Sequence, residues 1–235
     1  MNYKPTTAVT PFTPRAPTST QALPAHINGL SLVNLAARQR MLSQRMILQT
    51  LLAARGDAQK LEAAQRSLQI FTESQQHLLA TPRQLEPASA QKIQATYEGV
   101  RGVGPVIDTF MQLMRRTLEQ IERKAPGVAE SLIELVGHTD RILEALNTAT
   151  TAFDDITRAK SDAMMKELAG IVGDIQSVAK EAKVVSFNAQ IMAARAGQHG
   201  REFAVVANVL SDITGEIDGL TRKAAVLADR NKLAA

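Results

Sequence analysis

Two stretches near the end of the chain repeat small or apolar residues at alternating spacings of three and four. The first stretch comprises Leu168, Ile171, Ile175, Val178, Ala182, Val185, Ala189, Met192 and Ala196, and the second comprises Phe203, Val206, Leu210, Ile213, Ile217, Leu220, Ala224 and Leu227. This heptad spacing is typical of coiled-coil helices. The two series are mirror images about a point between Gly197 and Gln198, so helices folded there would place layer against layer. The pattern predicts an antiparallel coiled-coil hairpin over residues 166–235, with its tip at residues 197–200.

Residues 26–165 carry further helical patterns separated by glycine and proline. We expect helices over about residues 26–55, 58–80 and 89–124, with a kink or short break in the third between Gly99 and Pro105. A fourth helix begins near Val128 and meets no strong breaker before the hairpin, so it is expected to continue into the first arm. Because the connections are short, the pattern predicts an antiparallel four-helix bundle, and no stretch reads as a strand. The expected fold class is therefore all-α.

Residues 1–25 are rich in proline and threonine, which predicts a disordered segment before the bundle. They lack the apolar core of a signal peptide, and no apolar run approaches the roughly 18 to 20 residues that a membrane span needs. We therefore expect no membrane span and a cytoplasmic location.

Composition excludes several classes of function. The chain has no cysteine, so disulfides and thiolate metal sites are ruled out, and its four histidines show no ligand spacing. The net charge of +4 is mild and only 3% of residues are aromatic, so no basic patch with stacking rings points to nucleic acid. No nucleophile and base pair, and no phosphate loop after a strand, can be identified. We expect no catalysis, no metal and no cofactor.

The first helix carries arginines on apolar stripes. Arg45 shares a stripe with Met41 and Leu48, and Arg40 shares another with Val33 and Ile47. Buried guanidinium groups on such stripes need partners, which are either an acid of the fourth helix, namely Glu130, Glu134, Glu144 or another one, or a bound anion. Arg40 and Arg45 lie about 140° apart around the helix, so one helix cannot easily aim both at one ion. Two copies meeting across a dimer axis could.

The segment Asn34-Leu-Ala-Ala-Arg-Gln-Arg-Met-Leu-Ser-Gln-Arg-Met46 resembles the signature of the PilJ-type N-terminal domain of type IV pili methyl-accepting transducers. This helical bundle also occurs in nitrate and nitrite sensors, in which two arginines of the equivalent helix bind the anion at a dimer interface. The resemblance places these arginines at Arg40 and Arg45, with Arg38, Ser43 and Gln44 beside them. It implies a homodimer that binds a small inorganic anion, nitrate or nitrite.

The predicted tip, Ser186 to Ala207, resembles the signalling tip of methyl-accepting chemotaxis proteins. The resemblance implies that the tip contacts a chemotaxis kinase, a coupling protein or another signalling protein through Asn188, Met192, Arg195, Gln198, Arg201 and Phe203. Met192 and Gln198 stand where that family usually has glutamate. The alternative to a sensor is a ligand-free helical scaffold or adaptor that modulates chemoreceptor arrays or another regulatory partner.

Overall fold

The computed structural model describes residues 24, 26–98 and 101–234, and every regular element in them is helical. The elements are α1 (Leu32–Ala53), α2 (Ala58–Ala80), the 3-10 turn η1 (Thr81–Gln84), α3 (Pro87–Glu98), α4 (Gly104–Glu122), α5 (Val128–Gly137), α6 (Thr139–Arg195), the 3-10 turn η2 (Gly197–Gly200) and α7 (Arg201–Ala234). The expected all-α class is confirmed. The expectation of disorder for residues 1–25 lies outside the described residues, apart from Pro24. No helix in the described ranges is both long and apolar enough to cross a membrane.

Side-chain caps fix where the first two helices begin. The Ser31 hydroxyl accepts a hydrogen bond from the backbone N–H of Asn34 over 3.2 Å, and the Asp57 carboxylate accepts one from Lys60 over 3.1 Å. Each cap satisfies a backbone donor that has no partner within its helix. Gly56, with φ of +100°, makes the turn between α1 and α2. These two helices can therefore fold back on each other as a pair.

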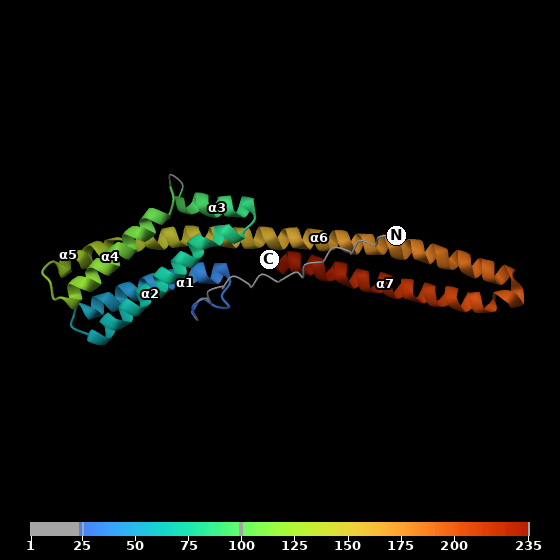
Figure 1. Cartoon of the computed structure of the whole chain (residues 1–235), viewed down its shortest axis with the longest axis horizontal. Coiled ribbons are helices and arrows are strands. Elements are labelled where there is room, and N and C mark those ends of the chain that lie inside the picture. Colours follow the sequence, from blue (N-terminus) through green and yellow to red (C-terminus); the bar gives the residue numbers. More distant parts are fainter. Residues whose placement is uncertain (1–23, 25, 99–100, 235) are drawn as a thin grey trace, which may run out of the picture.

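The bundle core lies between α1, α2, α4 and the first part of α6, and α3 and α5 complete it (Figure 1). Phe71 of α2 and Phe110 of α4 meet edge to face, with ring centroids 5.8 Å apart. Phe153 of α6 and Met46 of α1 are also fully buried. The hydrophobic contacts of these large side chains hold the bundle around α6.

The third expected helix is two helices, α3 and α4, and the second turns away from the first (Figure 1). At the start of α4 the backbone approaches α3 so closely that a Cβ on Gly104 would lie 2.8 Å from the Tyr97 carbonyl oxygen. The fourth expected helix also begins as a separate element, because α5 is followed by His138 and then α6. The bundle therefore has more helical segments than the pattern predicted.

Helix α6 has 57 residues and is unbroken through Gly170 and Gly173. At 1.5 Å per residue it is about 85 Å long. It packs on α1 and α3 in the bundle and then extends beyond the bundle as the first arm of the hairpin, with α7 returning beside it (Figure 1). A single continuous helix thus joins the bundle to the hairpin tip.

The contact between α6 and α7 is made by small residues rather than by the predicted seam. The buried positions repeat every seven residues and are Val172, Ala179, Ser186 and Ala193 on α6, and Gly200, Ala207, Thr214 and Thr221 on η2 and α7. The predicted seam lies beside this contact. Most of its side chains are exposed, with Val178 at 64% and Val206 at 62%, and the rest are half-buried, namely Ala182, Ala189, Leu210, Ile217 and Ala224. The expectation that the two seams pack against each other within one chain is therefore wrong for the exposed seam residues, whereas the half-buried ones border the contact. Small side chains allow the two backbones to approach, and the larger side chains remain beside the contact.

The two exposed seams lie on the same side of the hairpin. On α6, Val178 and Val185 come one residue before the buried Ala179 and Ser186. On α7, Val206 also comes one residue before a buried position, as do Ile213 and Leu220. The same offset on two helices that run in opposite directions turns both seams to one side. One chain therefore presents a long apolar face, which we call the seam face.

The turn at the tip depends on two glycines. Gly197 has φ of +59°, a conformation that residues with a Cβ rarely adopt. A Cβ on Gly200 would lie 2.2 Å from the Ala193 carbonyl oxygen, so only glycine fits between η2 and the end of α6. Below the turn, Gln190 Nε2 donates to Asn208 Oδ1 over 2.9 Å and ties the two helices together.

Candidate functional site

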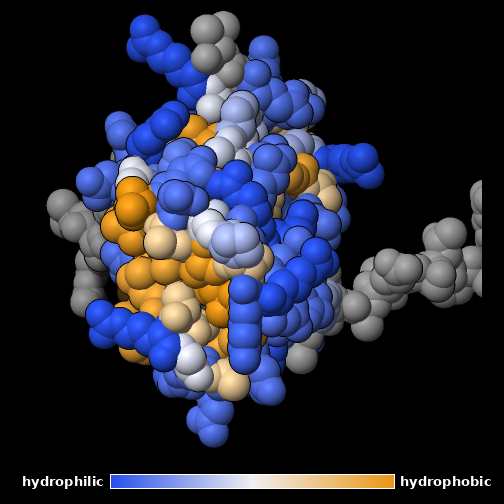
Figure 2. Space-filling model, turned by 90° about the vertical axis from the view of Figure 1, so that its left-hand side faces the viewer, coloured by the Kyte–Doolittle hydropathy of each residue, from blue (hydrophilic) through white to orange (hydrophobic). Residues whose placement is uncertain are grey.

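The outer face of α1 exposes apolar and basic side chains together. Met41 is 59% exposed and Leu48 is 58% exposed, and Arg40, Gln44 and Arg45 are exposed beside them. The stripe that carries Arg45 is therefore exposed in the single chain, whereas an apolar helical stripe usually faces a protein core. Figure 2 looks at the end of the bundle that carries α5 and shows hydrophobic side chains gathered on one side of this end. The bundle thus has apolar surface that its own helices do not cover.

Arg40 is held by the long helix. Its Nη1 donates a hydrogen bond of 2.7 Å to Oδ1 of Asn147, which belongs to α6. A guanidinium group has five N–H donors, so this bond leaves most of them available on the exposed side. Arg40 is positioned without being neutralised.

Arg45 is positioned by its own helix. The Gln49 amide forms hydrogen bonds through both its oxygen and its nitrogen when the oxygen faces Arg45. Arg45 Nε then donates a hydrogen bond of 3.2 Å to this oxygen. In that orientation the Gln49 nitrogen donates to Ser67 Oγ on α2 over 3.0 Å. The Nη donors of Arg45 remain available for a ligand.

No acid of the described residues, including Glu130, Glu134 and Glu144, lies within ion-pair distance of Arg40 or Arg45. Glu134 pairs with Arg116 of α4 instead. Arg40 and Arg45 are therefore two exposed positive charges without a carboxylate partner in this part of the chain.

The other expected ligand residues do not share one surface. Arg38 is half-buried, and its Nη1 donates to the His26 carbonyl oxygen over 2.6 Å. Ser43 is fully buried, and its hydroxyl donates to the Arg40 carbonyl oxygen over 2.8 Å. Of the five residues, the structure brings Arg40, Gln44 and Arg45 to the exposed side of α1.

The six residues expected at the hairpin tip are all exposed. Met192 and Phe203 belong to the two halves of the seam face, close to the turn. Phe187 is also exposed, and because it follows the buried Ser186 it lies on the opposite side of the hairpin from the seam face. Sequence reasoning did not single it out, although a large aromatic outside the heptad seam was a signal for it.

A polar cluster is buried where α1, α2 and α3 meet. Gln39 Nε2 donates to the Phe71 carbonyl oxygen over 3.0 Å and lies 3.4 Å from Gln75 Oε1. Burial raises the pKa of Tyr97 to about 12, and the nearby Gln75 amide opposes this effect in part. The Tyr97 phenol therefore stays neutral at physiological pH.

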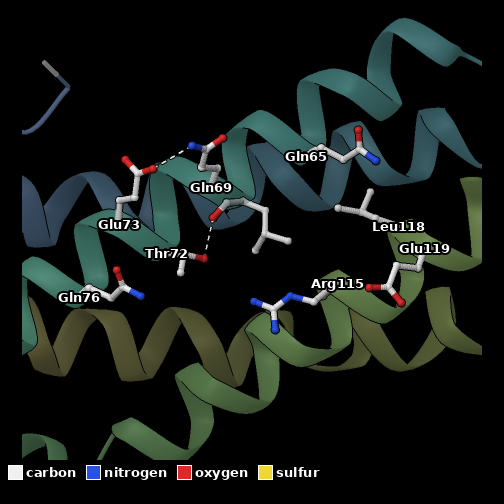
Figure 3. A pocket seen from close by; sticks show the side chains of 9 residues that line it. Gln65, Gln69, Thr72, Glu73, Gln76, Arg115, Leu118 and Glu119 are labelled. Carbon is white, nitrogen blue, oxygen red and sulfur yellow. Dashed lines mark hydrogen bonds between the residues drawn. The ribbon is translucent and has the colours of Figure 1, made fainter. Parts of the chain in front are cut away.

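An open groove with a volume of about 450 Å³ lies between α2 and α4, and most of the residues that line it are exposed. It is lined by Gln65, Leu68, Gln69, Thr72, Glu73 and Gln76 of α2 and by Arg115, Leu118 and Glu119 of α4 (Figure 3). We call it the α2–α4 cavity. Sequence reasoning missed it, although the glutamines at positions 65, 69 and 76 share one face of α2 at helical spacing.

Comparison with known proteins gives two matches. Residues 28–127, which include α1 to α4, match the family model described as type IV pili methyl-accepting chemotaxis transducer N-terminal domain. The chain is also 31% identical over 90 residues to the methyl-accepting chemotaxis protein McpS of Pseudomonas putida, a match that covers 38% of this chain and 12% of that protein. The matched region is thus a small part of the relative. No solved structure matches the chain significantly.

Proposed function

We propose that this protein is a signal-transduction sensor that binds a small oxyanion, nitrate or nitrite, between the α1 helices of two identical chains. Arg40 and Arg45 bind the anion, and the hairpin passes the signal to a protein partner. The similarity of residues 28–127 to chemotaxis transducers supports the sensor class. The observation that carries the ligand is the pair of exposed guanidinium groups on α1 that have no acid partner in the described residues.

The apolar residues around these arginines support the second chain. Met41 and Leu48 are more than half exposed on the same stripe as Arg45, and burial of this stripe would require a surface of similar character. When two copies of α1 meet, their arginines come together and repel each other unless an anion lies between them. Anion binding and the packing of the two chains are then coupled.

The connection from α1 to α6 supports the relay. Arg40 is bonded to Asn147, and α6 continues from Asn147 to Arg195 without a break. A shift of α1 that moves Arg40 therefore acts on the helix that forms the hairpin. The ligand shifts the population between two packings of these helices.

The seam face and the tip support the output. The seam face is apolar along both helices, and a second hairpin from the partner chain would cover it. The exposed tip, with Asn188, Arg195 and Arg201 around η2, then contacts the signalling partner. That partner is a chemotaxis kinase, its coupling protein or another signalling protein.

Isothermal titration of the full chain with sodium nitrate and sodium nitrite, with sodium chloride as reference, tests the ligand. We expect binding at or below about 1 mM, and Arg40→Ala or Arg45→Ala should weaken it at least about tenfold, equivalent to 1.4 kcal/mol. Arg55→Ala, which removes an exposed arginine just after the end of α1, serves as the control and should change affinity less than about twofold. If neither ion binds well-folded protein, the sensor proposal fails and the ligand-free scaffold replaces it.

A further inference from the structure

The α2–α4 cavity is built from two helices that do not follow each other directly in the chain. Residues 65, 69, 72 and 76 form one face of α2, and Arg115 and Glu119 are one turn apart on α4. Leu68 and Leu118 are buried beneath and provide an apolar base. Its volume of about 450 Å³ lies in the range of roughly 300 to 1,000 Å³ that is usual for small-molecule sites.

Arg115 gives the cavity its positive group. No carboxylate of the described residues lies within ion-pair distance of it, whereas its neighbour Arg116 pairs with Glu134. Figure 3 shows the Arg115 guanidinium in the space between α2 and α4, pointing toward Thr72 and away from Glu119. A planar fork of N–H donors in this position matches a carboxylate.

Two acids flank this arginine and restrict the charge of the ligand. Glu73 accepts a hydrogen bond of 2.8 Å from Gln69, and its second oxygen lies 3.2 Å from His26 Nε2. Glu119 has no ion-pair partner among the described residues. One arginine against two glutamates leaves a net negative charge, which disfavours a dianion and favours a ligand that also carries a cation.

The remaining groups of the cavity are neutral and polar. The Thr72 hydroxyl donates to the Leu68 carbonyl oxygen over 2.8 Å and can still accept a hydrogen bond. The Gln69 amide oxygen is available because its nitrogen serves Glu73. Both can accept hydrogen bonds from an ammonium group or an amide, while Leu68 and Leu118 suit a short aliphatic part.

We infer that the α2–α4 cavity binds a small α-amino acid, whose carboxylate pairs with Arg115 and whose ammonium group faces Glu119. This site is separate from the proposed nitrate site, because it shares no residue with the exposed face of α1. The chain would then take two ligands of different chemistry, one within a single bundle and one between two chains.

Isothermal titration of the full chain with L-alanine and L-glutamine tests this inference, with propionate and succinate as comparison ligands. We expect at least one of the two amino acids to bind with a dissociation constant below about 1 mM, and both comparison ligands to bind at least about tenfold more weakly. Propionate lacks the ammonium group, and succinate carries a second negative charge toward the glutamates. Failure of both amino acids to bind, or equal binding of propionate, overturns the inference.

Variants locate the site. Arg115→Gln should weaken the amino acid at least about tenfold, whereas the adjacent Arg116→Gln should leave its affinity within about twofold. Glu119→Gln should weaken the amino acid but not propionate, which separates ammonium recognition from a general loss of structure. Equal affinity in the wild type and in Arg115→Gln contradicts the assignment. Arg115→Gln should bind nitrate with the wild-type affinity. The nitrate titration therefore distinguishes loss of the amino-acid site from loss of the proposed nitrate site on α1.

Discussion

The side chains of Arg40 and Asn147 join α1 to α6 through a hydrogen bond of 2.7 Å, across 107 residues of chain. Asn147 is exposed, and the bond uses one donor of the guanidinium group. Arg40 is the expected anion ligand, and α6 leads to the hairpin tip. This bond therefore connects the proposed ligand site directly to the helix that forms the hairpin.

Replacement of Asn147 should weaken nitrate binding, and aspartate should weaken it more than alanine. Asn147→Ala leaves the Arg40 side chain less restricted, so binding should weaken about two- to fivefold, since ordering a long side chain costs about 0.5–1.5 kcal/mol. Asn147→Asp places a carboxylate against Arg40 and competes with the anion, so it should weaken binding more than alanine does. Thr148→Ala, the exposed neighbour whose hydroxyl bonds to the Glu144 carbonyl oxygen, is the control. Equal affinities in all four proteins would show that Asn147 does not position Arg40.

The seam face should make the chain a dimer. A glutamate introduced by Val178→Glu would have to be buried against a second hairpin, and we expect the dimer dissociation constant to rise at least about tenfold. Lys180→Glu also introduces a glutamate, but it comes one residue after the buried Ala179, on the side away from the seam face. Sedimentation equilibrium of the two variants and the wild type measures the difference. A wild-type monomer, or equal effects of both variants, would contradict the prediction.

Periodicity predicted the hairpin but not which of its faces meet. The apolar heptad places Val178 and Val206 on the apolar faces of their helices. A single sequence does not reveal whether such a face packs against the other arm of the hairpin or against another chain. The residues that do meet, such as Ala179, Ser186 and Ala207, have small side chains, and they do not stand out in a hydrophobic pattern. Packing of small side chains between close helices is a tertiary property.

Site prediction from the sequence had a similar limit. Arg40 and Arg45 could be selected because their charge conflicts with their apolar surroundings, and both are exposed on α1. The Arg40 partner could not be predicted, because Asn147 is far away in the chain and only acidic side chains were expected as partners. Ser43 was included for its position in a motif, yet its hydroxyl bonds to its own helix inside the bundle. The α2–α4 cavity depends on how α4 packs on α2, a tertiary property that the helical pattern of the sequence does not show.

The close approach at the tip predicts that Gly200→Ala destabilises the hairpin. Its Cβ would lie 2.2 Å from a backbone oxygen of Ala193, so the turn must move, and we expect a loss of about 1–3 kcal/mol. Gly173→Ala is the matched control, because a Cβ there meets nothing within 4 Å and alanine favours a helix by about 0.5–1 kcal/mol. Urea unfolding followed by circular dichroism measures the free energy of unfolding, which should fall for Gly200→Ala and rise for Gly173→Ala. A stabilised Gly200→Ala would contradict the tight turn.

Tyr97 should make the protein sensitive to alkaline pH. Its pKa is about 12 in the folded chain and near 10 when unfolded, so the folded state holds the proton more tightly. This contribution is fully present below pH 10 and is lost as the pH rises through about 12, a loss of about 2–3 kcal/mol. Tyr97→Phe should flatten this decline when unfolding free energies at pH 9 and pH 11 are compared. An equal decline in both proteins would assign the alkaline sensitivity to other groups.

The tip itself predicts how the output depends on charge. In methyl-accepting chemotaxis proteins, which the tip resembles, glutamates usually stand at the positions of Met192 and Gln198, and both residues are exposed here. We expect the wild-type chain to recover little chemotaxis kinase or coupling protein in a pull-down, because two acidic contacts are missing. The combined variant Met192→Glu and Gln198→Glu should increase recovery several-fold at low salt and less at high salt, since exposed charges are screened within about 10 Å at 0.1 M ionic strength. Met192→Gln with Gln198→Asn changes the same positions without adding charge, so it separates electrostatics from shape. If the wild type recovers both proteins as well as the acidic variant does, the shape of the tip is sufficient for partner binding. The natural residues Met192 and Gln198 then do not determine which partner binds.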